Sequence, residues 1–211
     1  TITGQSRYAN ALDTYFAAWA GIYEPQGNPI NETHFLQLIL AYEIGGQYLS
    51  PPTHAQTIRL FQRMVEVTYD RKRIRPGTDT NNWQSHRVML ATALAYVLRD
   101  PALIVTSRGA FNKQVSRNID ADGVVLDFKQ RDALHYVVYS LRPLLIAALI
   151  ARQHGEDWYH FQAPSGASLT AALKWLAPYA DGDKTHLEFQ NTTSQFDRER
   201  AQAGVHGFSG L

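Results

Sequence analysis

The sequence predicts an all-α protein in which antiparallel helical hairpins form an (α/α) toroid or part of one. Apolar residues recur at steps of three and four, and runs with the alternating pattern of a strand are scarce. Proline, glycine and capping residues separate these periodic segments and leave short connections, which favour antiparallel neighbours. A bundle and a solenoid are the alternatives, and the absence of a repeat of fixed period argues against the solenoid.

Eight helices are predicted, each bounded by a cap, a proline or a glycine. Asp100 followed by Pro101 is typical of a helix start, and Pro143 is expected to kink the longest helix. A turn at 120–123 leads to a brief strand at 124–126. The approximate helix ranges are 6–23, 32–45, 51–70, 80–98, 101–118, 130–154, 168–177 and 194–203.

The composition is that of a single folded domain over residues 1–211. The chain has 20 Lys and Arg against 19 Asp and Glu, so the net charge of +1 gives no long-range field for nucleic acid or anionic lipid. We therefore expect no nucleic-acid partner and no membrane partner. The absence of cysteine excludes disulfides, thiolate nucleophiles and iron–sulfur clusters. The chain begins with Thr1 and shows no leader pattern, which suggests a mature or trimmed protein.

The predicted helix over 130–154 carries an unusual polar row. Arg131, His135, Tyr139 and Arg142 follow one another at helical spacing and share a face, while the opposite face is apolar enough to bury the helix. A solvated face is one interpretation, although Lys and Glu would be its usual residues. Two arginines with a histidine and a tyrosine are suited to bind an anion, because arginine can hold a carboxylate through two hydrogen bonds.

A second polar group lies at the start of the helix over 80–98. It combines two amides, an indole, an imidazole and a guanidinium, which are Asn81, Asn82, Trp83, His86 and Arg87. Amides bind hydroxyl and carboxyl oxygens, and an exposed indole stacks on a sugar ring, so this set predicts a sugar-binding surface. Alternatively, Asn81 caps the helix, Trp83 anchors the core and His86 is structural.

A third candidate is the loop over 27–32, which contains Asn28. Its composition favours a turn followed by a cap, but loops at hairpin ends also line the mouth of a helical toroid. The sequence contains no HExxH, GxGxxG, GxSxG or P-loop motif, and its eight histidines lack the spacing of metal ligands. We therefore expect neither a metal nor a cofactor.

Two segments resemble the alginate lyase superfamily of helical-toroid polysaccharide lyases. They are Asn81-Asn82-Trp83 and the run Ala133-Leu-His-Tyr-Val-Val-Tyr-Ser-Leu-Arg-Pro-Leu144. In the better-known branch, an Asn-Asn-His motif opens one helix, and the second tyrosine of the later run is catalytic. By this resemblance Tyr139 takes the place of that tyrosine, and Asn82 takes the place of the amide that neutralises the substrate carboxylate.

The sequence departs from that branch at two positions. Trp83 stands where the branch has a histidine, and Asp132 stands where it has an arginine, so His86 and Arg131 are the candidates to replace them. Together with Asn28 in its loop, these segments look closest to family 38 of the polysaccharide lyases. Toroids of this type are usually longer than this chain, and we expect some helices to be missing.

The resemblance implies cleavage of a uronic-acid polymer such as alginate, polymannuronate or glucuronan by β-elimination. It makes Tyr139 the base and acid, with Asn82, His86 and Arg131 as the other catalytic residues. A secreted or periplasmic location follows from such a substrate. Asn28 is a second candidate for the neutralising amide, and Tyr136 for the acid and base. The expected substrate-binding residues are Asn28, Asn81, Trp83, Arg87, His135 and Tyr136.

Two other functions stay open at this point. A helical-toroid glycoside hydrolase would use a pair of carboxylates, for which Glu32, Asp79 and Asp127 are available. A non-catalytic uronan-binding domain would use the same polar rows without turnover.

Overall fold

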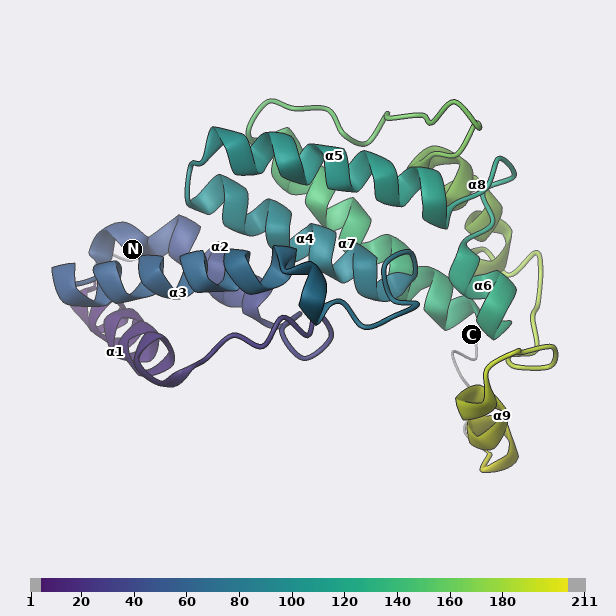
Figure 1. Cartoon of the computed structure of the whole chain (residues 1–211), viewed down its shortest axis with the longest axis horizontal. Coiled ribbons are helices and arrows are strands. Elements are labelled where there is room, and N and C mark those ends of the chain that lie inside the picture. Colours follow the sequence, from purple (N-terminus) through teal and green to yellow (C-terminus); the bar gives the residue numbers. More distant parts are fainter. Residues whose placement is uncertain (1–4, 205–211) are drawn as a thin grey trace.

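Helices form almost all of the regular structure in residues 5–204, the part of the chain that the computed structural model describes (Figure 1). Two short 3₁₀ helices, η1 and η2, accompany the α-helices. Between residues 5 and 204, strand pairing is limited to two isolated bridges, Ile119 with Val125 and Gln162 with Ser168. The elements are α1 (Ser6–Ile22), α2 (Phe35–Gly45), η1 (Gly46–Tyr48), α3 (Pro51–Tyr69), η2 (Arg71–Arg73), α4 (Asn82–Val97), α5 (Pro101–Asn118), α6 (Leu126–Arg131), α7 (Leu134–Gln153), α8 (Leu169–Ala180) and α9 (Gln195–Gln202).

Helix α4 is the central element. It packs against α7, α5, α2 and α3, and its residues are buried on nearly all sides. Figure 1 shows α5 running alongside α4, with α1 to α3 at one end of the array and α6 and α8 at the other. A helix buried all round has no solvent face, so polar side chains on α4 need either internal partners or a cavity.

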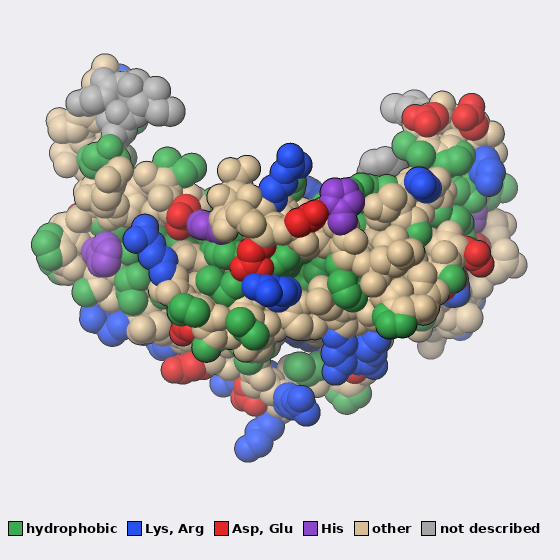
Figure 2. Space-filling model, turned by 90° about the horizontal axis from the view of Figure 1, so that it is seen from above, with side chains coloured by type: hydrophobic (Ala, Val, Ile, Leu, Met, Phe, Trp, Pro, Cys, Tyr) green, Lys and Arg blue, Asp and Glu red, His purple; other side chains and the backbone are tan. Residues whose placement is uncertain are grey.

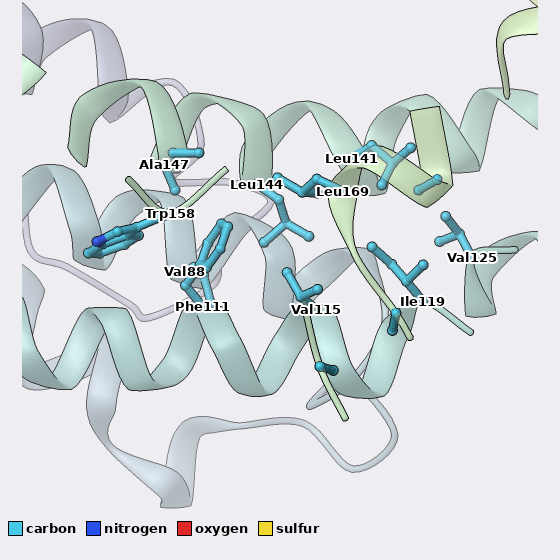
Figure 3. Packing of buried hydrophobic residues seen from close by; sticks show 14 of the residues in the cluster. Val88, Phe111, Val115, Ile119, Val125, Leu141, Leu144, Ala147, Trp158 and Leu169 are labelled. Carbon is cyan, nitrogen blue, oxygen red and sulfur yellow. The ribbon is translucent and has the colours of Figure 1, made fainter. Parts of the chain in front are cut away.

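Two apolar clusters make up most of the core, and α4 contributes to both. Val88 of α4 packs with Phe111, Leu144 and Trp158 in a cluster between α4, α5, α7 and the segment before α8 (Figure 3). Met89, on the next position of α4, belongs instead to the cluster formed with α1, α2 and α3. Neighbouring positions of α4 therefore face different halves of the molecule.

Helix α7 is long and apolar. Among the described residues it is the one helix that is long and apolar enough to cross a membrane, with a mean hydropathy of 1.6. Its side chains Leu141, Leu144, Ala147 and Ala151 are nevertheless packed in the core between α4 and α8. Packing within this array is thus sufficient to explain its composition.

The predicted single helix over 130–154 is wrong. Asp132 adopts a left-handed conformation with φ of 51°, which ends α6, and α7 starts two residues later. The backbone carbonyl of Asp132 accepts a hydrogen bond from Phe189, and its carboxylate accepts one from Asn191. Contacts with a distant segment therefore override the local helical pattern. The brief strand predicted at 124–126 is also wrong, because only the bridge at Val125 forms.

The surface carries both signs of charge. Figure 2, seen from the side of α5, shows acidic and basic side chains dispersed over this face, and its outline is hollowed between two raised ends. This agrees with the near-zero net charge. An anionic ligand must therefore be held by local groups rather than by a general field.

Candidate active site

The close packing of α4 against α7 brings His86 and Tyr139 together. Their ring centroids are 4.5 Å apart, and the ring planes are inclined by 47°. Both side chains line a cleft of about 270 Å³ between α2, α4 and α7. The complete lining consists of Ile30, Thr33, His34, Leu36, Gln37, His86, Met89, Tyr139, Arg142, Pro143 and Ile146.

His86 is buried, but one of its ring nitrogens has no partner. Its Nδ1 lies 2.7 Å from the hydroxyl of Thr33, whereas Nε2 makes no hydrogen bond to any described residue. Burial lowers the pKa of His86 from 6.5 to about 4, against the opposing effect of the Tyr139 backbone, and the charge of Arg142 lowers it further. The imidazole is therefore neutral at neutral pH. A neutral imidazole with a free nitrogen is suited to proton transfer.

Tyr139 is half-buried, and its phenol group makes no hydrogen bond within residues 5–204. Burial raises the pKa of Tyr139 above its usual value of 10, so the phenol is protonated at neutral pH. The sequence predicted that Arg131 and His135 would share one helix face with Tyr139. Arg131 ends α6, so that prediction is wrong for Arg131, whereas His135 lies on α7 with Tyr139 but does not line the cleft.

Polar side chains at the rim complete the cleft. Arg142 lies one turn after Tyr139 on α7, and His34 and Gln37 come from the start of α2. All three are exposed, so they are available to an incoming ligand. The sequence patterns did not indicate Thr33, His34 or Gln37. The one signal for them is that they follow the loop over 27–32, a candidate part of a toroid mouth.

Arg131 belongs to a second, closed cluster with α9. Its guanidinium forms a two-point ion pair with the buried carboxylate of Asp197 and lies 3.8 Å from the ring centroid of Tyr136. The hydroxyl of Tyr136 accepts a hydrogen bond from Arg131 at 2.5 Å. Although burial opposes ionisation, the hydrogen bonds and charge of Arg131 hold the pKa of Asp197 below its usual value. These residues attach α9 to α6 and α7.

His135 is also committed to the C-terminal segment. Its Nδ1 lies 2.9 Å from Glu188, whose other carboxylate oxygen accepts the backbone N–H groups of Leu134 and His135. Glu188 thus binds the first N–H groups of α7. The break at Asp132 separates Arg131 from the rest of the predicted row. Tyr139 and Arg142 line the cleft, whereas Arg131 and His135 bind the C-terminal segment.

Asn82 lies in a buried polar network behind the cleft lining. Its amide nitrogen donates to Asp127 at 2.5 Å, and Asn118 donates to the other oxygen of the same carboxylate at 3.1 Å. Asn118 in turn accepts from Ser140 at 3.0 Å. Burial raises the pKa of Asp127, and the donated hydrogen bonds oppose this effect. Asn82 is 3% exposed and does not line the cleft, so it has no direct access to a ligand there.

The remaining predicted residues have local roles. The Asn81 side chain caps α4 by accepting from the backbone N–H of Trp83. The Trp83 side chain is half-buried and lines neither the cleft of His86 nor the cavity of Arg87. The side-chain oxygen of Asn28 accepts from the backbone N–H of Ile30, as in a turn. Arg87 is buried and lines a different cavity from His86.

The three carboxylates available to a hydrolase are not paired with one another. Glu32 accepts hydrogen bonds from Tyr23 and two backbone N–H groups, Asp79 forms an ion pair with Arg117, and Asp127 belongs to the network of Asn82. Within the described residues, no group of three or more acidic or histidine side chains is placed to hold a metal ion. The carboxylate arrangement thus does not favour a two-carboxylate glycosidase.

The helical hairpins and the cleft between them define an (α/α) toroid fold or part of one. The chain resembles the crystal structure of an alginate lyase from Bacteroides ovatus, with a TM-score of 0.61 and 22% identity over 81% of this chain and 45% of that one. The alginate lyase family model matches residues 1–186, so the chain belongs to that family. A polysaccharide lyase from Stenotrophomonas maltophilia (strain K279a) is 39% identical over 72 residues, which cover 34% of this chain and 21% of that protein. The chain thus spans less than half the length of these two relatives.

Proposed function

We propose that this chain cleaves a uronic-acid polymer by β-elimination, as a polysaccharide lyase or as part of one. The observation that carries the proposal is the pairing of His86 with Tyr139 beside one cleft, where Nε2 of His86 and the phenol of Tyr139 make no hydrogen bond to a described residue. Membership of the alginate lyase family and the names of the similar proteins support the same activity.

The substrate carboxylate must be neutralised before the reaction can proceed. The C5 proton of a uronate is weakly acidic, and its removal places negative charge on the adjacent carboxylate. At the rim of the cleft, Arg142 supplies a cation, Gln37 an amide and His34 an imidazole. In this proposal they take the part that the resemblance implied for Asn82 and Arg131, whose side chains are bound elsewhere.

The pKa directions favour separate roles for the two rings. His86 is neutral and takes the C5 proton at Nε2, which is buried in the free protein, so the sugar must displace neighbouring side chains to reach it. A bound carboxylate strengthens the imidazole as a base because an opposite charge raises its pKa. The C5–H electrons form the C4=C5 double bond, and the C4–O4 bond breaks. Tyr139 is protonated and donates its proton to the departing O4. A proton transfer from His86 back to Tyr139 then restores both groups.

A pH profile distinguishes this division of roles from a mechanism in which Tyr139 is also the base. We expect kcat/KM to be level through neutral pH and to fall as the pH approaches about 4, where His86 becomes protonated. A phenolate base would instead make kcat/KM rise steadily toward pH 10, because the pKa of Tyr139 is raised.

The activity is tested by offering purified protein alginate, mannuronan and glucuronan and recording ultraviolet absorbance from the unsaturated product. We expect absorbance to develop with at least one polymer. Hydrolysis would release reducing sugar without absorbance, and binding without turnover would identify a uronan-binding domain. A polymer of this size does not cross membranes unaided, so we also propose a secreted or periplasmic location.

A further inference from the structure

A second, larger cavity lies on the side of α4 that carries Arg87. Its volume is about 470 Å³, and it is formed by the end of α3, the segment over 71–79, α4 and α5. This size falls within the range of about 300–1,000 Å³ that is usual for small-molecule sites. His86 and Arg87 are adjacent in sequence, yet they line different cavities.

The cavity is lined by an excess of positive charge. Arg71, Arg75 and Lys113 are exposed at its edge, and none of them forms an ion pair with any residue between 5 and 204. Arg117 is partly neutralised by Asp79 at 3.3 Å, which is the only acidic residue of the lining. The near-zero net charge of the chain makes this local excess distinctive. An anion is the ligand that such a surface favours.

Arg87 provides a fixed cation at the floor of this cavity. The side chain is 4% exposed, and its guanidinium donates to the backbone carbonyl of Thr78, the hydroxyl of Thr78 and the side chain of Gln84. These three hydrogen bonds use three of the five N–H donors of an arginine. Among the described residues the other two have no acceptor. A pre-positioned guanidinium with free donors is suited to bind a carboxylate.

We propose that this cavity is a second binding site for uronate units of the polymer, separate from the cleft of His86 and Tyr139. The identity of the polymer rests on the proposed function, whereas the preference for a carboxylate rests on the lining. A long chain that occupies the cleft and this site together would gain affinity without any new contact at the reacting sugar, since the second contact is intramolecular. Inorganic phosphate shares the same chemistry and is the competing ligand.

The test uses the variant Arg71→Gln/Arg75→Gln/Lys113→Gln in a Tyr139→Phe background, so that the polymer is not consumed. The matched control is Arg59→Gln/Arg152→Gln/Lys174→Gln, which removes three exposed cations outside this cavity. Calorimetric titration with polymeric alginate at low salt should show a Kd about tenfold higher for the first variant, which corresponds to about 1.4 kcal/mol. The control should bind as the Tyr139→Phe parent does.

A second measurement uses the same triple substitutions with Tyr139 intact. We expect KM for the polymer to rise several-fold, with kcat unchanged. The kinetics on a trisaccharide should change less, because a short substrate has fewer sugar units with which to occupy a second site. Equal Kd values for the two triple variants would overturn the inference. Displacement of alginate by an equal concentration of inorganic phosphate would overturn the assignment to a uronate.

The two proposals fail separately. Suppose that no polymer yields ultraviolet absorbance but the first triple variant still binds alginate more weakly than the control. The second binding site is then supported, and the proposed lyase activity is wrong. If absorbance develops and the two variants bind equally, only the second site is wrong.

Discussion

Two polar clusters flank the start of α7, and each combines a tyrosine with basic side chains. In the cleft, Nε2 of His86 and the phenol of Tyr139 have no hydrogen-bond partner among residues 5–204. In the cluster near α9, Arg131, Tyr136 and Asp197 bind one another. Similar residue types therefore serve two purposes, and their pairing distinguishes them. A cluster whose polar groups are all paired stabilises the fold, whereas unpaired polar groups beside a cleft are candidates for chemistry.

The largest expected difference is in how a substitution in each cluster changes kcat. Tyr139→Phe should lower kcat about 10³-fold, because proton transfer by a positioned side chain contributes about 10²–10⁴-fold. Tyr136→Phe is the matched control, since its hydroxyl binds Arg131 and Arg200 rather than facing the cleft. It should retain most of the activity. Ultraviolet product assays on both variants provide the measurement, and the comparison is wrong if Tyr136→Phe is the more damaging change.

The closed cluster should matter more for stability. Arg131→Ala leaves the fully buried carboxylate of Asp197 without its main partner and should reduce the free energy of unfolding by about 3 kcal/mol. Arg117→Ala removes an exposed ion pair with Asp79 and should reduce the free energy of unfolding by about 1 kcal/mol or less. Urea unfolding of the two variants tests this. Similar losses would mean that the Asp197 cluster does not act as a buried ion pair.

His86 should make the cleft sensitive to acid. The pKa of His86 is lowered in the folded state to about 4, so the unfolded chain binds more protons between pH 4 and 6.5 and stability falls as the pH drops through this range. At pH 5 this group lowers the free energy of unfolding by about 2 kcal/mol relative to pH 7.5. His86→Gln should remove that part of the slope in urea unfolding at the two pH values. An unchanged slope would contradict the burial of a neutral imidazole.

The smallest effect is expected at the rim of the cleft. Arg142 is exposed, so Arg142→Gln should raise KM about three- to tenfold through weaker attraction to the uronate carboxylate, with a smaller change in kcat. Because the interaction is screened by ions, the difference from the wild type should shrink as salt is added. Steady-state kinetics at low and high salt test this, and a KM equal to that of the wild type at low salt would remove Arg142 from the site.

Local sequence signals were sufficient to predict where most helices begin and end. Pro51 opens α3, and Asp100 caps α5 by accepting from the N–H groups of Ala102 and Leu103, as its place before Pro101 predicted. These signals work because a cap or a proline acts within one turn. The break at Asp132 could not be predicted in this way, because the groups that stabilise it lie at Phe189 and Asn191.

The candidate site was predictable to a similar extent. The resemblance singled out Tyr139, and the spacing of α4 drew attention to His86, and these two side chains do meet. The orientation of His86 by Thr33 depends on a contact across 53 residues, which no local pattern encodes. Asn82 was selected for its amide, but Asp127, 45 residues later, binds that amide. Residue type indicated the chemistry, and tertiary pairing determined which groups remained available for it.

Helix α4 belongs to both apolar clusters, so the two clusters are expected to unfold together. Neither cluster keeps its packing if α4 leaves its place, since Val88 and Met89 face opposite halves. The two halves are therefore mechanically coupled through one element, and calorimetry of the chain should record one heat-absorption peak for both.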